Sequence, residues 1–165
     1  MLVPSVGQAN QMAETFFVML NKLRDFAVRF RAIIDAADRS TWGVVFKSFP
    51  RGSCGAVSEM FGTYLLEEKS IESSIVHATH SGGFGAYGSH AWLKVSDVIL
   101  DLAGDQFQHD PLPVPFVDTD RTWHDQWTID SSTPFDRWLD INRDQMFFTW
   151  GNAYRDILRA LERAE

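Results

Sequence analysis

Apolar side chains recur at steps of three and four along residues 12–37, the spacing of one face of an α-helix. They are Met12, Phe16, Leu20, Leu23, Phe26, Phe30, Ile33 and Ala37. Charged residues fall between these positions, as in a helix that packs one apolar face on a core. The pattern therefore predicts a long packing helix near the N-terminus.

The same period returns over residues 54–69. One face of this segment holds Cys54, Val57, Phe61 and Leu65. Pro50 and Gly52 interrupt the chain just before it. We expect a second helix here, with Ser53 as its N-cap, because a serine hydroxyl can accept a hydrogen bond from a first-turn amide.

Strand-like patterns occupy the middle of the chain. Residues 71–79 are rich in β-branched side chains, and residues 90–95 and 98–104 are apolar runs separated only by Ser96 and Asp97, which predicts a hairpin. Residues 110–116 contain three prolines and read as an extended connection. Residues 127–129 suggest one more strand, and helices follow Pro134. Consecutive strands flanked by helices predict an α+β fold with an antiparallel sheet.

Length and composition fit one domain over residues 1–165. We divide it into an N-terminal helix (1–40), a helix-and-sheet core (42–130) and C-terminal helices (134–165). A net charge of -7 disfavours nucleic acid and anionic membranes as partners. The one cysteine and the lack of a secretion signal favour a cytoplasmic location, with signal-independent secretion left open. We expect no metal and no cofactor, since H-E-x-x-H and a second cysteine are missing.

Cys54 is expected at the first turn of its helix. Unpaired amides and the helix dipole favour a thiolate there. Gly55 beside it leaves backbone amides open to a carbonyl oxygen, as in an oxyanion hole. The competing interpretation is a buried structural thiol, since free cysteines are among the most buried residues.

The hairpin supplies a base and a carboxylate if its turn has two residues. Val95 then faces Val98, and His90 and Asp101 lie on the same face, one diagonal step apart. The imidazole can donate to the carboxylate, which fixes a histidine tautomer. A turn of odd length would put the two side chains on opposite faces. The alternative for Asp101 is a structural carboxylate that binds backbone amides.

These residues resemble a known group of enzymes. The stretch GSCG at a helix start, His-Ala-Trp on one strand and an aspartate on the next are similar to the transglutaminase-like branch of the papain-like thiol enzymes. The resemblance covers about residues 49–107. It implies a catalytic helix packed on a small antiparallel sheet, with Cys54 as nucleophile, His90 as general base and acid, and Asp101 as the orienting carboxylate. Lys94 and Leu102 depart from the family, which often has an acidic residue and a proline there.

Further residues are candidates for the same site. Ser48, Ser53 and Gly55 are candidates for the oxyanion hole, and Trp92 and Gln106 for the cleft; Trp42 is a second candidate wall. Asp105 is a candidate to replace Asp101 as the carboxylate that orients His90, although a turn residue is the favoured interpretation. Residues 83–88 match G-x-G-x-x-G but run into a strand, so we expect a flap or a surface loop instead of a nucleotide site.

The expected activity is that of a thiol hydrolase or acyltransferase acting on an amide or peptide bond of a peptide or protein substrate. A cysteine peptidase or amidase is favoured. A protein-glutamine deamidase or transglutaminase-type toxin or effector is the alternative, and so is a catalytically silent binding or immunity module on the same fold.

Overall fold

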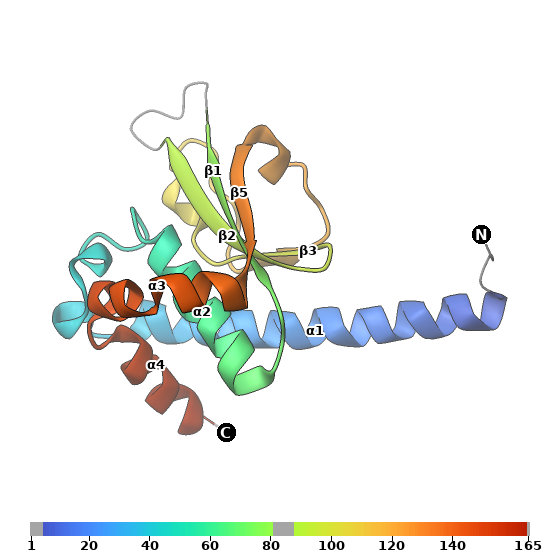
Figure 1. The fold of residues 1–165 in the computed structure, drawn as a ribbon, viewed down its shortest axis with the longest axis horizontal. Coiled ribbons are helices and arrows are strands. Elements are labelled where there is room, and N and C mark those ends of the chain that lie inside the picture. The colour runs from blue at the N-terminus through green and yellow to red at the C-terminus, as the bar shows by residue number, and fades with distance from the viewer. Residues whose placement is uncertain (1–4, 81–87, 165) are drawn as a thin grey trace.

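A computed structural model describes residues 5–80 and 88–164. Its main helices are α1 (Val6–Ala36), α2 (Cys54–Lys69), α3 (Phe135–Trp150) and α4 (Ala153–Glu162). Its strands are β1 (Ser74–Thr79), β2 (Ser89–Val95), β3 (Val98–Asp101), β4 (Phe116–Asp118) and β5 (Thr128–Pro134). The strands form an antiparallel sheet in the order β4-β3-β2-β1-β5, with the helices gathered beside it (Figure 1). The predicted α+β class is confirmed; residues 81–87, where we expected a flap, lie outside the described part.

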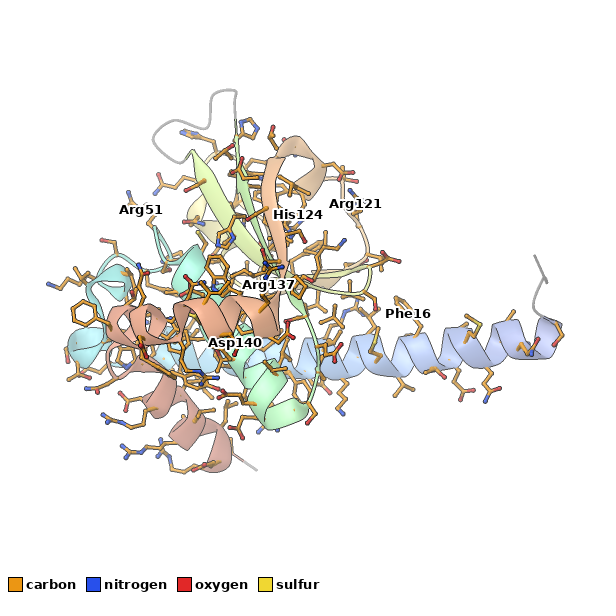
Figure 2. The ribbon with its side chains drawn as sticks, viewed as in Figure 1. Phe16, Arg51, Arg121, His124, Arg137 and Asp140 are labelled. Atoms are coloured by element: carbon orange, nitrogen blue, oxygen red, sulfur yellow. The ribbon has the colours of Figure 1, made fainter. Side chains whose placement is uncertain are left out.

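Helix α1 starts earlier than its apolar pattern predicts. Ser5 caps it through a reciprocal capping box with Gln8. Its later turns pack on α4 and β4, whereas its first turns extend beyond the rest of the molecule (Figure 1). Met12 is therefore 66% exposed and Phe16 is 39% exposed (labelled in Figure 2), although both belong to the predicted packing face. Burial of that face begins only near Leu23.

Helix α2 begins at Cys54 and has Ser53 as its N-cap residue, both as predicted. The expected capping hydrogen bond is wrong, because the Ser53 hydroxyl donates to the Pro50 carbonyl at 2.7 Å and accepts nothing from the first turn. The helix lies against β2, where the Ser58 hydroxyl donates to the Ala91 carbonyl at 3.1 Å. This contact fixes the start of α2 close to the start of β2.

Alternation along β2 and β3 separates two apolar clusters. Leu93 and Leu100 belong to the large cluster shared with the helices. The second cluster contains Val76, Ala78, Trp92, Ile99, Phe107 and Trp127. Trp42 belongs to the large cluster, and its indole nitrogen donates to Asp156 at 3.1 Å, so the idea that it walls a cleft is wrong.

The β2–β3 hairpin has the predicted two-residue turn. Val95 faces Val98, and Ser96 takes a left-handed φ of 52° to close the turn. β3 ends at Asp101, earlier than expected, because a short 3-10 helix over Gly104–Gln106 follows. β4 was not predicted, because it starts at Phe116 directly after the proline-rich connection. None of the helices in the described residues is both long and apolar enough to cross a membrane.

Candidate active site

His90 and Asp101 form a buried pair on one face of the hairpin. His90 Nε2 lies 2.7 Å from Asp101 Oδ2, and both side chains are fully buried. The other carboxylate oxygen accepts from the Ala103 backbone amide at 2.9 Å. The two-residue turn therefore produces the geometry that the sequence predicts for this pair. His90 presents Nδ1, its second nitrogen, to Gln106 and Cys54.

Cys54 reaches this pair from the start of α2. Its side chain is half-buried and interacts with the imidazole of His90, the side chain of Gln106 and the backbone of Ala91. Burial raises the pKa of the thiol, but these hydrogen bonds and the charge of His90 outweigh it, and the pKa falls below its ordinary value. The arrangement favours a thiolate at Cys54.

Asp101 controls the charge of His90. Burial lowers the pKa of this imidazole, but the charge and hydrogen bond of Asp101 overcome it and raise the pKa of His90 to about 10. Burial likewise raises the pKa of Asp101, but the charge of His90 and a hydrogen bond from His124 hold it well below its ordinary value. The carboxylate stays ionised and stabilises an imidazolium.

His124 is a member of the site that the sequence did not reveal. Its Nε2 lies 3.0 Å from Asp101 Oδ2, the oxygen that also meets His90, and its side chain is buried (labelled in Figure 2). Its Nδ1 has no hydrogen-bond partner among the described residues. An ionised carboxylate can only accept, so His124 donates to Asp101 through Nε2. The only signal in the sequence was a histidine within the aromatic stretch TWHDQW.

We expect His124→Phe to lower the rate of any Cys54-dependent acylation by about five-fold, because Asp101 keeps its contact with His90 but loses one of its donors, worth roughly 1 kcal/mol. The rise in rate with pH should move to higher pH, because a carboxylate with one donor fewer attracts the His90 imidazolium more strongly and His90 loses its proton at higher pH. A pH–rate profile measures this. The matched control is His109→Phe, which changes an exposed histidine. A loss of rate with no shift of the profile would contradict a positioning role.

Gln106 occupies the space between His90 and the segment before α2. Its Oε1 accepts from the Gly52 amide at 3.0 Å, and its Nε2 lies 3.0 Å from His90 Nδ1. A backbone N–H can only donate, so Gly52 fixes which end of the Gln106 amide faces the imidazole. The NH₂ group therefore donates to Nδ1. This contact places Gln106 directly beside the predicted catalytic histidine.

Asp101 and Gln106 favour different protonation states of His90. The ion pair with Asp101 favours an imidazolium, which carries a proton on Nδ1. The Gln106 donor favours a bare Nδ1, because two N–H groups cannot share a hydrogen bond. While the Gln106 amide stays in place, its donor therefore opposes the protonation of Nδ1 that Asp101 favours.

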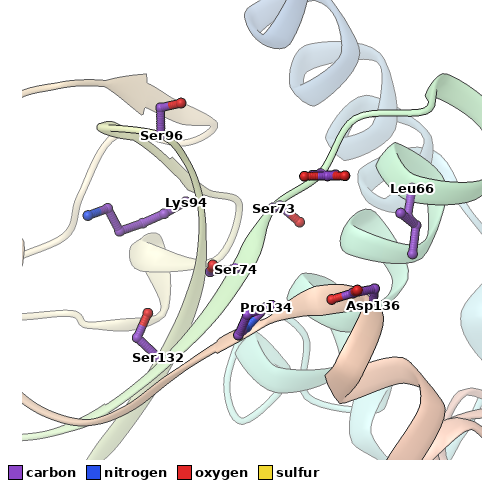
Figure 3. A pocket seen from close by; sticks show the side chains of 9 residues that line it. Leu66, Ser73, Ser74, Lys94, Ser96, Ser132, Pro134 and Asp136 are labelled. Carbon is purple, nitrogen blue, oxygen red and sulfur yellow. The ribbon is translucent and has the colours of Figure 1, made fainter.

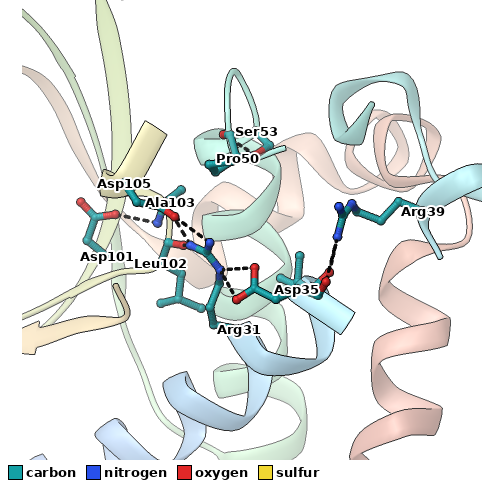
Figure 4. Close-up of polar contacts among 10 residues, drawn as sticks. Arg31, Asp35, Arg39, Pro50, Ser53, Asp101, Leu102, Ala103 and Asp105 are labelled. Atoms are coloured by element: carbon teal, nitrogen blue, oxygen red, sulfur yellow. Dashed lines mark hydrogen bonds and ion pairs between the residues drawn. The ribbon is translucent and has the colours of Figure 1, made fainter. Parts of the chain in front are cut away.

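A buried arginine from α1 holds the segment after Asp101. Arg31 donates to the Leu102 carbonyl at 2.5 Å and binds Asp105 at 2.7 Å and Asp35 at 2.9 Å (Figure 4). Asp105 is therefore committed to Arg31, and the idea that it substitutes for Asp101 is wrong. The same contacts position the 3-10 helix that carries Gln106.

The remaining predicted residues lie in different environments. Ser53 is fully buried with its hydroxyl bound to Pro50, and Ser48 is exposed in the turns before α2, so neither hydroxyl is presented to Cys54 as an oxyanion donor. Gly55 follows Cys54 and has open space where a side chain would be. Trp92 is buried, with its ring 5.6 Å from that of His90, so it packs under the imidazole instead of forming a wall of an open cleft.

Two cavities show where ligands have room. One, of about 250 Å³, is lined by Gly52 and Gly55 on either side of Cys54, together with residues of α3. Another, of about 480 Å³, has Lys94, Ser96 and Asp136 among its lining residues (Figure 3). Lys94 thus lines a cavity to which none of the three predicted catalytic residues contributes. The three predicted catalytic residues do not line the cavity beside Gly55 either, but Gly55 directly follows Cys54 in the chain.

Within the described residues, no group of three or more histidine, cysteine, aspartate or glutamate side chains is arranged to hold a metal ion. The paired histidines and Asp101 have their nitrogen and oxygen atoms directed at one another instead.

Comparisons with protein-family models, with curated proteins and with solved structures each found no match. The function is therefore argued from the site. Its geometry defines a buried histidine–aspartate pair that faces a thiol at a helix start.

Proposed function

We propose that this protein is a thiol enzyme of the papain-like, transglutaminase-like kind, in which Cys54 attacks an acyl carbon. The observation that carries the proposal is the 2.7 Å contact between His90 and Asp101, which leaves Nδ1 of His90 on the side of Cys54. A helix that begins at the nucleophile and packs on an antiparallel sheet supports the same family.

The chemistry follows from the contacts. His90 Nδ1 takes the proton of the Cys54 thiol, and the sulfur forms a bond to the carbonyl carbon of an amide or ester. The carbonyl oxygen carries the negative charge of the tetrahedral intermediate. When the intermediate collapses, the bond to the leaving group breaks and His90 returns the proton to that group. Asp101 stabilises the imidazolium throughout these steps.

The acyl-enzyme is resolved by a nucleophile that His90 deprotonates. Water gives hydrolysis, as in a cysteine peptidase or amidase, and an amine gives acyl transfer. We favour hydrolysis of an amide bond in a peptide or protein. The cavity beside Gly55, of about 250 Å³, has room for a side chain of such a substrate.

Reactivity of the one cysteine tests the proposal. Iodoacetamide should alkylate Cys54 in the folded protein faster at pH 6 than the same thiol in denaturant, and p-nitrophenyl acetate should give a burst of nitrophenolate. Cys54→Ala should lose both reactions, because the chain contains no other thiol. A folded thiol that reacts no faster than the unfolded one would identify a catalytically silent module and contradict the proposal.

A further inference from the structure

We propose that Gln106 is a mobile oxyanion donor: its amide rests on His90 Nδ1 and moves to the carbonyl oxygen when an acyl group reaches Cys54. This inference rests on the proposed function, because it assigns a role in the same reaction. It is carried by the two contacts of the Gln106 amide, one to Gly52 and one to His90, at 3.0 Å each.

The first step of the inference is the position of the NH₂ group. It touches Nδ1, the nitrogen that must accept the thiol proton, and it is also a hydrogen-bond partner of the Cys54 thiol. A carbonyl carbon in position for attack lies about 3–3.5 Å from the nucleophile, so its oxygen comes close to any group that already contacts the sulfur. A small movement therefore brings the Gln106 donor to the carbonyl oxygen.

The second step is that Nδ1 must lose this contact before it can act. While the amide donates to Nδ1, the lone pair that would take the thiol proton is occupied. Binding of a carbonyl offers the NH₂ group a better acceptor, because that oxygen becomes negatively charged in the transition state. One movement thus frees the base and supplies the oxyanion donor, and the site is activated only by a substrate that has a carbonyl oxygen.

The third step is that the contacts of Gln106 let its NH₂ group turn while they hold its Oε1 atom and its backbone in place. Oε1 stays bound to the Gly52 amide and acts as a pivot. The backbone of Gln106 is held by a bond to the Ala103 carbonyl at 3.2 Å, and Arg31 fixes the adjoining Asp105 (Figure 4). The Cys54 backbone amide is a candidate second donor, because it lies in the first turn of α2 and the N-cap Ser53 makes no side-chain hydrogen bond to that turn.

Two reagents separate this role from a structural one. p-Nitrophenyl acetate acylates the thiol through an oxyanion, whereas iodoacetamide alkylates it without one. In Gln106→Met we expect the ratio of the acylation to the alkylation rate constant to fall by about 10²-fold, the lower end of the loss caused by removing one oxyanion donor. Gln108→Met is the matched control, since Gln108 is exposed and lies two residues away; its ratio should equal that of the wild type.

A second variant distinguishes the loss of the hydrogen-bond donor from misfolding of Gln106→Met. Gln106→Glu keeps the acceptor for the Gly52 amide but has no donor, and a loss in the ratio is again expected. The new charge affects thiolate formation in both reactions but repels the oxyanion in acylation alone, so the loss in Gln106→Glu should be at least as large as in Gln106→Met. If both rate constants fall in proportion, or neither changes, the inference is wrong. If instead wild-type reactivity survives Cys54→Ala, the proposed function itself fails.

Discussion

His90→Gln should lower the rate of Cys54 acylation by about 10⁴-fold, the upper end of what a positioned general base contributes. His90 supplies both the base that takes the thiol proton and the acid that protonates the leaving group. Glutamine fills a similar volume, and its side chain can still reach Asp101, but it cannot exchange a proton. The burst of nitrophenolate from p-nitrophenyl acetate measures the loss.

The pH dependence of alkylation gives this prediction a second readout. In the wild type, His90 lowers the pKa of the Cys54 thiol, so reactivity with iodoacetamide persists at low pH. Without the imidazole, only the weaker hydrogen bonds of Gln106 and Ala91 oppose burial, which has the largest effect on the thiol and raises its pKa. The midpoint of the alkylation curve should therefore move above the ordinary thiol value of about 8.5. His109→Gln, at an exposed histidine, should leave both curves unchanged, and an unmoved midpoint in His90→Gln would contradict the pairing of His90 with Cys54.

The same pair makes stability depend on pH in a defined direction. The pKa of His90 is raised from 6.5 to about 10, so the protein gains stability from this group in full below pH 6.5 and loses it as the pH rises toward 10. In His90→Gln that alkaline loss should disappear. Thermal unfolding between pH 6 and 10 measures the difference.

The local parts of the site could be predicted because they depend on neighbouring residues. The period of the apolar positions placed the start of α2 at Cys54. The two residues between the apolar runs fixed the register of Val95 against Val98, and that register placed His90 and Asp101 on one face. Each inference needs only the geometry of a helix or of a hairpin.

The parts that could not be predicted depend on contacts between distant segments. His124 reaches Asp101 from a loop 23 positions later, and Arg31 reaches Asp105 across 74 positions. No period in the sequence reports such contacts. The hydrogen bond of the Ser53 hydroxyl was mispredicted for a related reason. This hydroxyl could accept from a first-turn amide of α2 or donate to a nearby carbonyl, and in the structure it donates to Pro50.

The exposed start of α1 shows the limit of periodicity as a guide to burial. Met12 and Phe16 continue the apolar face, yet the molecule ends before it reaches them (Figure 1). A periodic pattern reports that a segment is amphipathic, and the position of the neighbouring elements decides how much of it is covered.

Asp101→Asn should lower acylation by about 10³–10⁴-fold, a loss like that seen when the orienting aspartate of a catalytic triad is replaced by asparagine. The cause lies in the hydrogen bonds of the carboxylate. Oδ2 accepts from His90 and His124, and Oδ1 accepts from the Ala103 amide. An asparagine has only one oxygen, so its NH₂ group must face either the two imidazoles or a backbone N–H.

Either orientation of the asparagine side chain disrupts a hydrogen bond that the site needs. If the NH₂ group faces the imidazoles, the His90 proton moves from Nε2 to Nδ1, and the base is lost. If it faces Ala103, two donors meet inside the core. Since removing one partner of a buried pair typically costs about 3–5 kcal/mol, we expect the free energy of unfolding at pH 7 to fall by about 3 kcal/mol.

Acid unfolding separates this effect from a general loss of packing. The pKa of Asp101 is depressed below its ordinary value of 3.8, so the stability it contributes is complete above pH 3.8 and is lost as the pH falls further. Asp101→Asn should therefore remove part of the acid limb of the stability curve as well as lowering its plateau. Asp97→Asn changes an exposed carboxylate in the same hairpin and should alter neither feature. If Asp101→Asn lowered the plateau but kept the wild-type acid limb, Asp101 would not be ionised in the native protein, and His90 would lack the charge that makes it a base.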